Sequence, residues 1–191
     1  MFNKINTLLK NGGLIAFPTD TVWGIGCLPT HPQAVEKIYE LKGRDKNKPL
    51  ILMSHKLDFL KPYTHHPFPK IAEKLAQQHW PGALTLVLEK SNQTPDYITA
   101  NLNTVGIRIP NSLLFQEICH HIDGHVLATT SANLSGKEPA TNYHEALEAI
   151  GNKVDFVLFG HEGNSKKSST VVGFDNENPI IFRQGDIKIC F

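Results

Sequence analysis

Short apolar runs recur along the chain, and each is about as long as one β-strand. They occupy 14–17, 49–53, 84–89, 104–110, 126–130, 155–159, 169–174 and 180–183. The helical spacing of apolar residues predicts helices in the opening segment before Gly12 and at 33–42, 68–79, 112–121 and 142–150. Alternating strands and helices are typical of an α/β fold, and the closely spaced late strands favour antiparallel neighbours. The pattern therefore predicts a mixed sheet flanked by helices.

The length of the chain fits one domain. Its 191 residues, of which 40% are hydrophobic, suffice for a substantial core, so we expect a single domain over 1–191. The net charge of +1 excludes a globally basic coat for nucleic acid. The sequence has no run of about 18 apolar residues and no signal-peptide pattern, which predicts a cytoplasmic protein without membrane contact.

The cysteines and histidines form no familiar metal pattern. Cys27, Cys119 and Cys190 are far apart, which excludes a C-x-x-C pair and argues against a disulfide framework. We interpret the adjacent pairs His65-His66 and His120-His121 as surface or packing residues, because neighbouring side chains point to different sides. Motifs for phosphate loops, dinucleotides, zinc proteases and nucleophile elbows are absent. The sequence therefore predicts no protein-held metal.

Polar loops follow several of the predicted strands, where open α/β sheets commonly bind ligands. These loops are 18–26, 42–48, 131–136 and 163–168. In the first loop, Thr19 and Thr21 could hydrogen-bond a small polar ligand, and Gly24 and Gly26 permit close backbone approach. The same residues would equally suit a turn that satisfies its own backbone groups. The loop alone leaves these two alternatives open.

The loop at 42–48 concentrates positive charge. Lys42, Arg44, Lys46 and Lys48 fall within seven residues at a helix-to-strand junction. A guanidinium fork beside flexible ammonium groups suits a polyphosphate. A solvated charged loop is the alternative, and charge runs are usually of that kind.

Isolated polar residues mark the later strands. Ser131 and Asn133 follow the strand 126–130 and suit either a nucleotide contact or a local cap. Arg108 lies inside an apolar strand, where its charge needs a buried ion pair or a bound anion. Ser169 opens one late strand and Arg183 closes another, so both are candidates for the same strand-end site.

Taken together, the motifs resemble the YrdC-like family of threonylcarbamoyl-AMP synthases. The resemblance covers nearly the whole chain in one order: PTDTVWG at 18–24, Lys42-Gly43-Arg44, WPGALT at 80–85, TVGIRIP at 104–110, SANLSG at 131–136, Ser-Thr-Val-Val at 169–172, and Arg183 to Gly185. Each motif alone is modest, but their joint order is specific. The family often has Tyr where this chain has Trp23. The length resembles the short single-domain form, in which a cover over the site must come from the protein's own loops, its C-terminal residues or a partner.

The resemblance implies a fold, a reaction and a set of site residues. The fold is a twisted open mixed sheet with flanking helices and a concave, positively charged face. The reaction is a nucleotidyl transfer in which L-threonine, bicarbonate and ATP give L-threonylcarbamoyl-AMP and pyrophosphate. On this basis we assign catalysis to Lys42 and Arg44; ATP binding to Lys42, Arg44, Lys46, Ser131, Asn133 and Arg183; and threonine and bicarbonate binding to Thr19, Thr21, Arg108 and Ser169.

The resemblance also implies partners. Mg²⁺ is expected to accompany ATP without a dedicated protein site, and tRNA-modification proteins are expected to use the product. Direct contact with tRNA is left open. Two other functions remain as alternatives: an RNA-binding module without catalysis, and a carbamoyl-transfer domain of the hydrogenase-maturation type. The absence of any C-x-x-C pair argues against the second alternative.

Overall fold

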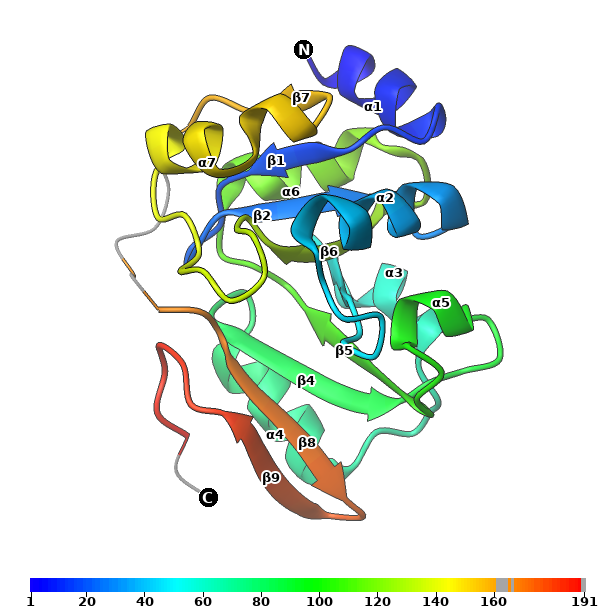
Figure 1. The fold of residues 1–191 in the computed structure, drawn as a ribbon. Coiled ribbons are helices and arrows are strands. Elements are labelled where there is room, and N and C mark those ends of the chain that lie inside the picture. The colour runs from blue at the N-terminus through cyan, green and yellow to red at the C-terminus, as the bar shows by residue number, and fades with distance from the viewer. Residues whose placement is uncertain (161–164, 166, 190–191) are drawn as a thin grey trace.

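The computed structural model describes residues 1–160, 165 and 167–189, and in these residues nine strands form one sheet (Figure 1). The strands are β1 Ile15–Phe17, β2 Gly24–Cys27, β3 Ile51–Ser54, β4 Leu84–Glu89, β5 Thr104–Arg108, β6 Val126–Ser131, β7 Phe156–Val157, β8 Thr170–Asp175 and β9 Asn178–Arg183. Their order is β7-β1-β2-β6-β3-β5-β4-β8-β9. The pairs β1–β7, β3–β5 and β4–β8 are parallel, and the other neighbours are antiparallel. The predicted mixed sheet is confirmed.

Helices cover both faces of this sheet (Figure 1). They are α1 Phe2–Lys10, α2 Pro32–Lys42, α3 Leu57–Leu60, α4 Lys70–His79, α5 Asp96–Thr99, α6 Leu113–His121 and α7 Tyr143–Ile150. Alternate residues of a strand point to opposite faces. Ile15 and Phe17 therefore pack with α1 and α6, whereas Ala16 belongs to the larger core under α2, α4 and α7. Among the described residues, no helix is long and apolar enough to cross a membrane.

The end of α2 controls the direction of the basic loop. Gly43 caps the helix with φ 56°, a left-handed conformation that glycine adopts without a Cβ penalty. The chain turns there, so Lys42 stays in the buried last turn while Arg44 leaves the helix. The Arg44 N–H still bonds to the Tyr39 carbonyl at 2.9 Å, which fixes the start of the loop.

One strand and two α-helices lie where the sequence predicted none. β2 occupies part of the predicted loop 18–26, and α3 and α5 are single-turn helices. β2 escaped prediction because two of its four residues are glycines, which are depleted in strands. A Cβ on Gly24 or Gly26 would lie 2.8 or 3.1 Å from the Phe17 ring, so these glycines make room for a neighbouring side chain. Within the loop 163–168, only Ser165, Lys167 and Ser168 belong to the described residues, and Cys190 lies outside them.

Candidate functional site

A cleft that is open to solvent lies at the ends of β2, β5, β6 and β9. Its rim also includes the loop before β2 and the loop after α2. Seven of the ten predicted site residues line it: Thr19, Thr21, Arg44, Arg108, Ser131, Ser169 and Arg183. Three do not: Lys42, Lys46 and Asn133. The structure therefore brings together most residues that the sequence singled out, although they are spread over most of the chain.

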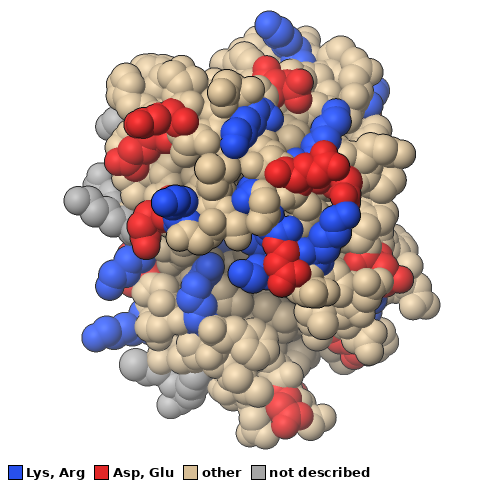
Figure 2. Space-filling view, viewed as in Figure 1, with Lys and Arg blue, Asp and Glu red and all other residues tan. Residues whose placement is uncertain are grey.

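The cleft carries a concentrated positive charge. The chain has three arginines, and all three line this cleft. Figure 2 shows basic side chains around the hollow in this face. The described lining residues include no aspartate or glutamate. A site of this composition favours a ligand with several negative charges.

Arg44 and Arg183 are held by uncharged partners. Arg44 donates from Nε to the Lys48 carbonyl at 3.2 Å and from Nη2 to the Pro49 carbonyl at 3.1 Å. Arg183 donates from Nε to the Ser169 carbonyl at 3.1 Å and from Nη2 to its hydroxyl at 3.2 Å. Burial and the charge of Arg44 lower the pKa of Arg183 from its ordinary value. The two guanidinium groups thus repel each other in an arrangement that a bound anion would relieve.

Arg108 is positioned differently, because it is buried and bonded to a carboxylate. Its Nη2 donates to Asp20 Oδ1 at 2.7 Å, and its Nε donates to the Gly82 carbonyl at 2.9 Å. Its Nη1 donates to Thr21 Oγ1 at 2.9 Å. Only 3% of the arginine side chain is exposed. A guanidinium has five N–H groups, so these three contacts leave two for a ligand.

The two threonines of the first loop form a directed hydrogen-bond chain. Thr19 Oγ1 donates to the Val22 carbonyl at 2.7 Å, so it must accept from Thr21 Oγ1, which lies 3.0 Å away. It also accepts the Thr21 N–H at 3.1 Å, which saturates the Thr19 hydroxyl. Thr21 donates to Thr19 and accepts from Arg108, which leaves one lone pair. In this structure Thr19 supports the loop, and Thr21 can only accept from a ligand.

Lys42 and Asn133 form a buried hub behind the cleft. Lys42 Nζ donates to the Ser131 carbonyl, to the Asn133 carbonyl at 2.7 Å and to Asn133 Oδ1 at 2.9 Å. The Asn133 amide also donates to the Leu134 and Lys137 carbonyls at 3.0 and 2.6 Å, and Ser131 Oγ donates to Asn133 Oδ1 at 2.6 Å. Burial, followed by the charge of Arg44, lowers the pKa of Lys42 to about 7.

This hub places two predicted ligands away from the cleft. The three acceptors around Lys42 match the three hydrogens of an ammonium, and the Asn133 side chain has no hydrogen-bonding capacity left. Lys42 and Asn133 therefore hold the loop 131–137 in this conformation, whereas we expected them to touch ATP. Ser131 differs, because its hydroxyl lines the cleft and still has free lone pairs.

Lys46 points away from the cleft. Its ammonium pairs with Glu36, and 70% of the side chain is exposed. It was predicted to bind the triphosphate because it follows Arg44 at an alternate position, but the loop after Gly43 is not extended and its residues diverge.

We expect the substitution Lys46→Gln to change the affinity for ATP by less than about twofold. Exposed ion pairs contribute little, and the guanidinium groups of the cleft stay unchanged. Calorimetric titration with a non-hydrolysable ATP analogue measures this effect. A tenfold loss would return Lys46 to the phosphate site.

Two residues that contact cleft side chains escaped the sequence analysis. Thr85 is fully buried, and its hydroxyl lies 2.8 Å from Ser169 Oγ, so it orients a cleft hydroxyl. Asp20 binds Arg108, as described above. The sequence does show a hydroxyl, Thr85, inside the apolar strand LTLVLE, and a carboxylate, Asp20, between two threonines. It does not show which residue each of them contacts, because the partner of Thr85 lies 84 positions away and the partner of Asp20 lies 88 positions away.

The cleft does not fit a resident divalent cation. Mg²⁺ prefers carboxylate, carbonyl and water oxygens, and the described lining residues supply guanidinium and hydroxyl groups instead. Within the described residues, no group of three His, Cys, Asp or Glu side chains could hold a metal ion.

Comparison with known families gives this geometry a context. The Sua5/YciO/YrdC family model, described as telomere recombination, matches residues 7–185. The chain belongs to the Sua5/YciO/YrdC family. The family resemblance and the predicted α/β fold are therefore confirmed, whereas the roles of single residues stay predictions.

Members of the family with curated names are similar along the whole chain. A threonylcarbamoyl-AMP synthase of Vibrio campbellii is 32% identical over 186 residues, which cover 96% of this chain and 98% of that relative. One of Pyrococcus abyssi is 35% identical over 181 residues, which cover 95% of this chain and 53% of the relative. The crystal structure of P. abyssi Sua5 complexed with L-threonine has a TM-score of 0.89 at 34% identity, covering 96% of this chain and 54% of that one. The chain thus spans about half the length of the Pyrococcus relative and nearly all of the Vibrio relative.

Proposed function

We propose that the chain is a threonylcarbamoyl-AMP synthase, a nucleotidyltransferase that forms L-threonylcarbamoyl-AMP from L-threonine, bicarbonate and ATP. The observation that carries the proposal is the convergence of all three arginines on one cleft lined with hydroxyl groups. Family members with that activity in their names support it, as does the threonine bound to P. abyssi Sua5.

The reaction has two bond-forming steps. The ammonium of threonine first loses a proton to water. The neutral amine then attacks the carbon of bicarbonate, and loss of water leaves a carbamate. A carbamate oxygen then attacks the α-phosphorus of ATP, and the bond to the β-phosphate oxygen breaks to release pyrophosphate. No protein nucleophile is required. The protein must hold several anions in line and exclude water, so positioning and positive charge supply the rate enhancement.

The residues of the cleft divide these tasks. Arg44 and Arg183 have unpaired N–H groups for the phosphates and for the charge that develops on pyrophosphate. Arg108 and Thr21 offer donors and one acceptor to threonine and its carbamate. Ser131 can accept a hydrogen bond from the nucleotide, and Ser169, oriented by Thr85, adds a hydroxyl between the two groups. The product would pass to partner proteins that modify tRNA.

The test is release of pyrophosphate by the purified chain. With threonine, bicarbonate, Mg²⁺ and ATP present, we expect release to exceed the rate without threonine by at least about tenfold. Mass spectrometry should detect threonylcarbamoyl-AMP. Release that does not depend on threonine, or no release, would contradict the proposal.

Two further arms separate the alternatives. Carbamoyl phosphate supplied in place of threonine and bicarbonate should give no carbamoyl-AMP, whereas a carbamoyl-transfer domain would make it. An RNA-binding module would shift RNA in a salt-dependent way and would bind neither threonine nor ATP in calorimetry.

A further inference from the structure

The cleft divides its charge unevenly between two groups of residues. Arg108 is the cleft arginine with a bonded carboxylate, because Asp20 Oδ1 lies 2.7 Å from its Nη2. Arg44 and Arg183 contact carbonyl and hydroxyl oxygens in the part of the chain that the structure describes. We call the Arg108–Thr21 side the paired half of the cleft and the Arg44–Arg183 side the unpaired half. Among the described side-chain contacts, the paired half contains an arginine bonded to a carboxylate, while the unpaired half contains two arginines bonded to uncharged oxygens.

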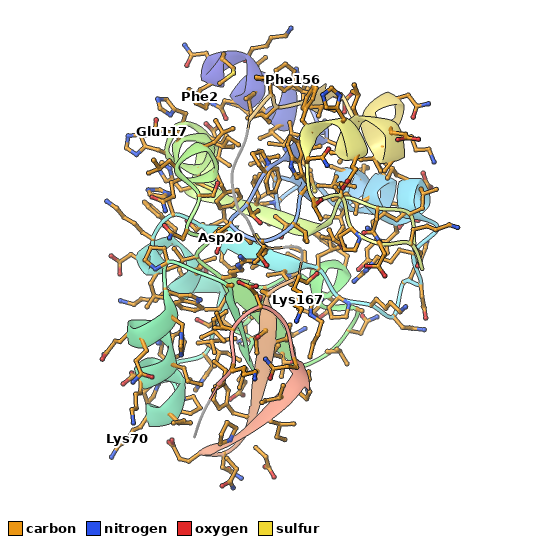
Figure 3. All side chains as sticks on the ribbon, turned by 90° about the vertical axis from the view of Figure 1, so that its left-hand side faces the viewer. Phe2, Asp20, Lys70, Glu117, Phe156 and Lys167 are labelled. Carbon is orange, nitrogen blue, oxygen red and sulfur yellow. The ribbon has the colours of Figure 1, made fainter. Side chains whose placement is uncertain are left out.

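Asp20 acts through Arg108 and not by lining the cleft. Its side chain is 15% exposed and comes from the segment between β1 and β2. Figure 3 places it at mid-height of the molecule, between Glu117 and Phe156 above and Lys70 below. It is absent from the cleft wall, whereas Arg108 and Thr21 belong to it. The Arg108 guanidinium therefore lies between the Asp20 carboxylate and a ligand in the cleft.

The paired half has the chemistry of a receptor for a zwitterion. Arg108 keeps two free N–H donors for a carboxylate. Thr21 Oγ1 keeps one lone pair, which can accept from an ammonium because the hydroxyl hydrogen is committed to Thr19. The negative field of Asp20 favours that ammonium and weakens the attraction of Arg108 for a polyphosphate.

We propose that Asp20 determines which substrate occupies each half of the cleft. By neutralising Arg108, it reserves the paired half for a zwitterionic amino acid and leaves phosphate groups to Arg44 and Arg183. The inference rests on the proposed function, since it takes threonine as the amino acid.

The substitution Asp20→Asn tests this assignment. Asparagine keeps the size of the side chain and an oxygen that accepts from Arg108, but it removes one negative charge. Threonine should then bind roughly tenfold more weakly, because its ammonium loses an attractive charge at close range. Inorganic pyrophosphate should bind roughly tenfold more tightly, because a third unneutralised guanidinium becomes available. Calorimetry measures both dissociation constants on the same protein.

The proposal requires the dissociation constants of threonine and pyrophosphate to change in opposite directions. Damage to the cleft would weaken both ligands, so a loss of affinity for both, or a change in neither, would overturn the proposal. Asp58→Asn is the matched control, because it makes the same chemical change in the exposed pair that Asp58 forms with Lys61 at 2.9 Å. It should alter neither dissociation constant. Asp20→Glu keeps the charge, and its affinity for pyrophosphate should stay within about twofold of the wild type.

A measurement on the unmodified chain covers the case in which Asp20→Asn does not fold. If the halves are reserved as proposed, saturating pyrophosphate should leave the dissociation constant of threonine unchanged. Displacement of threonine by pyrophosphate would overturn the inference. If the wild-type chain binds no threonine at all, the proposed function fails as well. If it binds threonine but the variant shifts both ligands in the same direction, only this inference fails.

Discussion

Replacing Lys42 with methionine is expected to lower the free energy of unfolding by about 3 kcal/mol. The substitution keeps the length of the side chain but removes the ammonium and its three hydrogen bonds. The Asn133 carbonyl loses its donor, whereas the Ser131 carbonyl and Asn133 Oδ1 each keep one other donor, the Asn133 N–H and the Ser131 hydroxyl. Each buried acceptor without a partner costs about 1–3 kcal/mol, and part of that cost is recovered as water enters. Chemical denaturation measures the change.

Turnover of the Lys42→Met variant should also fall by at least about tenfold, because Ser131 sits on the loop that the ammonium holds. Lys37→Met is the matched control. Lys37 lies on the same helix and donates to the Gly12 carbonyl at 3.0 Å, but that contact is exposed. We expect the control to lose less than about 0.5 kcal/mol. A stable Lys42→Met variant that fails only in ATP binding would instead make Lys42 a phosphate ligand.

Arg44→Gln and Arg183→Gln should each reduce kcat/KM for ATP by about a hundredfold, equivalent to about 2.7 kcal/mol. Glutamine can replace a hydrogen bond to a carbonyl, but it supplies no charge to the phosphates or to the departing pyrophosphate. Arg44→Lys should recover only part of the loss, since an ammonium cannot reproduce the planar fork. Steady-state kinetics with varied ATP at saturating threonine measure these values.

The affinity of the Arg44 and Arg183 variants for threonine serves as the comparison for their loss in kcat/KM for ATP. It should change by less than about threefold, because the Arg108–Thr21 pair stays intact. Lys61→Gln, in an exposed pair outside the cleft, should leave kcat/KM for ATP unchanged. If threonine binding collapses while the ATP kinetics persist, the two ligands occupy the opposite halves of the cleft.

Local chemistry explains what the sequence predicted well. Apolar runs and helix stops located most strands and helices, because burial and capping act over a few residues. β2 was missed because it contains two glycines, which are needed to leave room for the Phe17 ring of the neighbouring strand β1. The motifs likewise identified the polar residues at the strand ends, seven of which line one cleft.

The sequence could not predict which group donates and which accepts in individual hydrogen bonds. Thr19 and Thr21 have the same side chain, yet one hydroxyl is saturated and the other can still accept. That difference depends on the carbonyl of Val22 and on Arg108, which lies 87 positions beyond Thr21. Lys42 and Asn133, 91 positions apart, became a structural hub for the same reason. Roles within a site follow from partners that folding brings together.

The placement of the arginines has a practical consequence. Every guanidinium of the chain belongs to the cleft, because all three arginines line it. A dicarbonyl reagent selective for arginine would therefore react within the cleft alone, at Arg44 and Arg183, since Arg108 is 2% exposed. Protection from such labelling would report on occupancy of the unpaired half without any mutation, and peptide mapping would show which arginine each ligand covers.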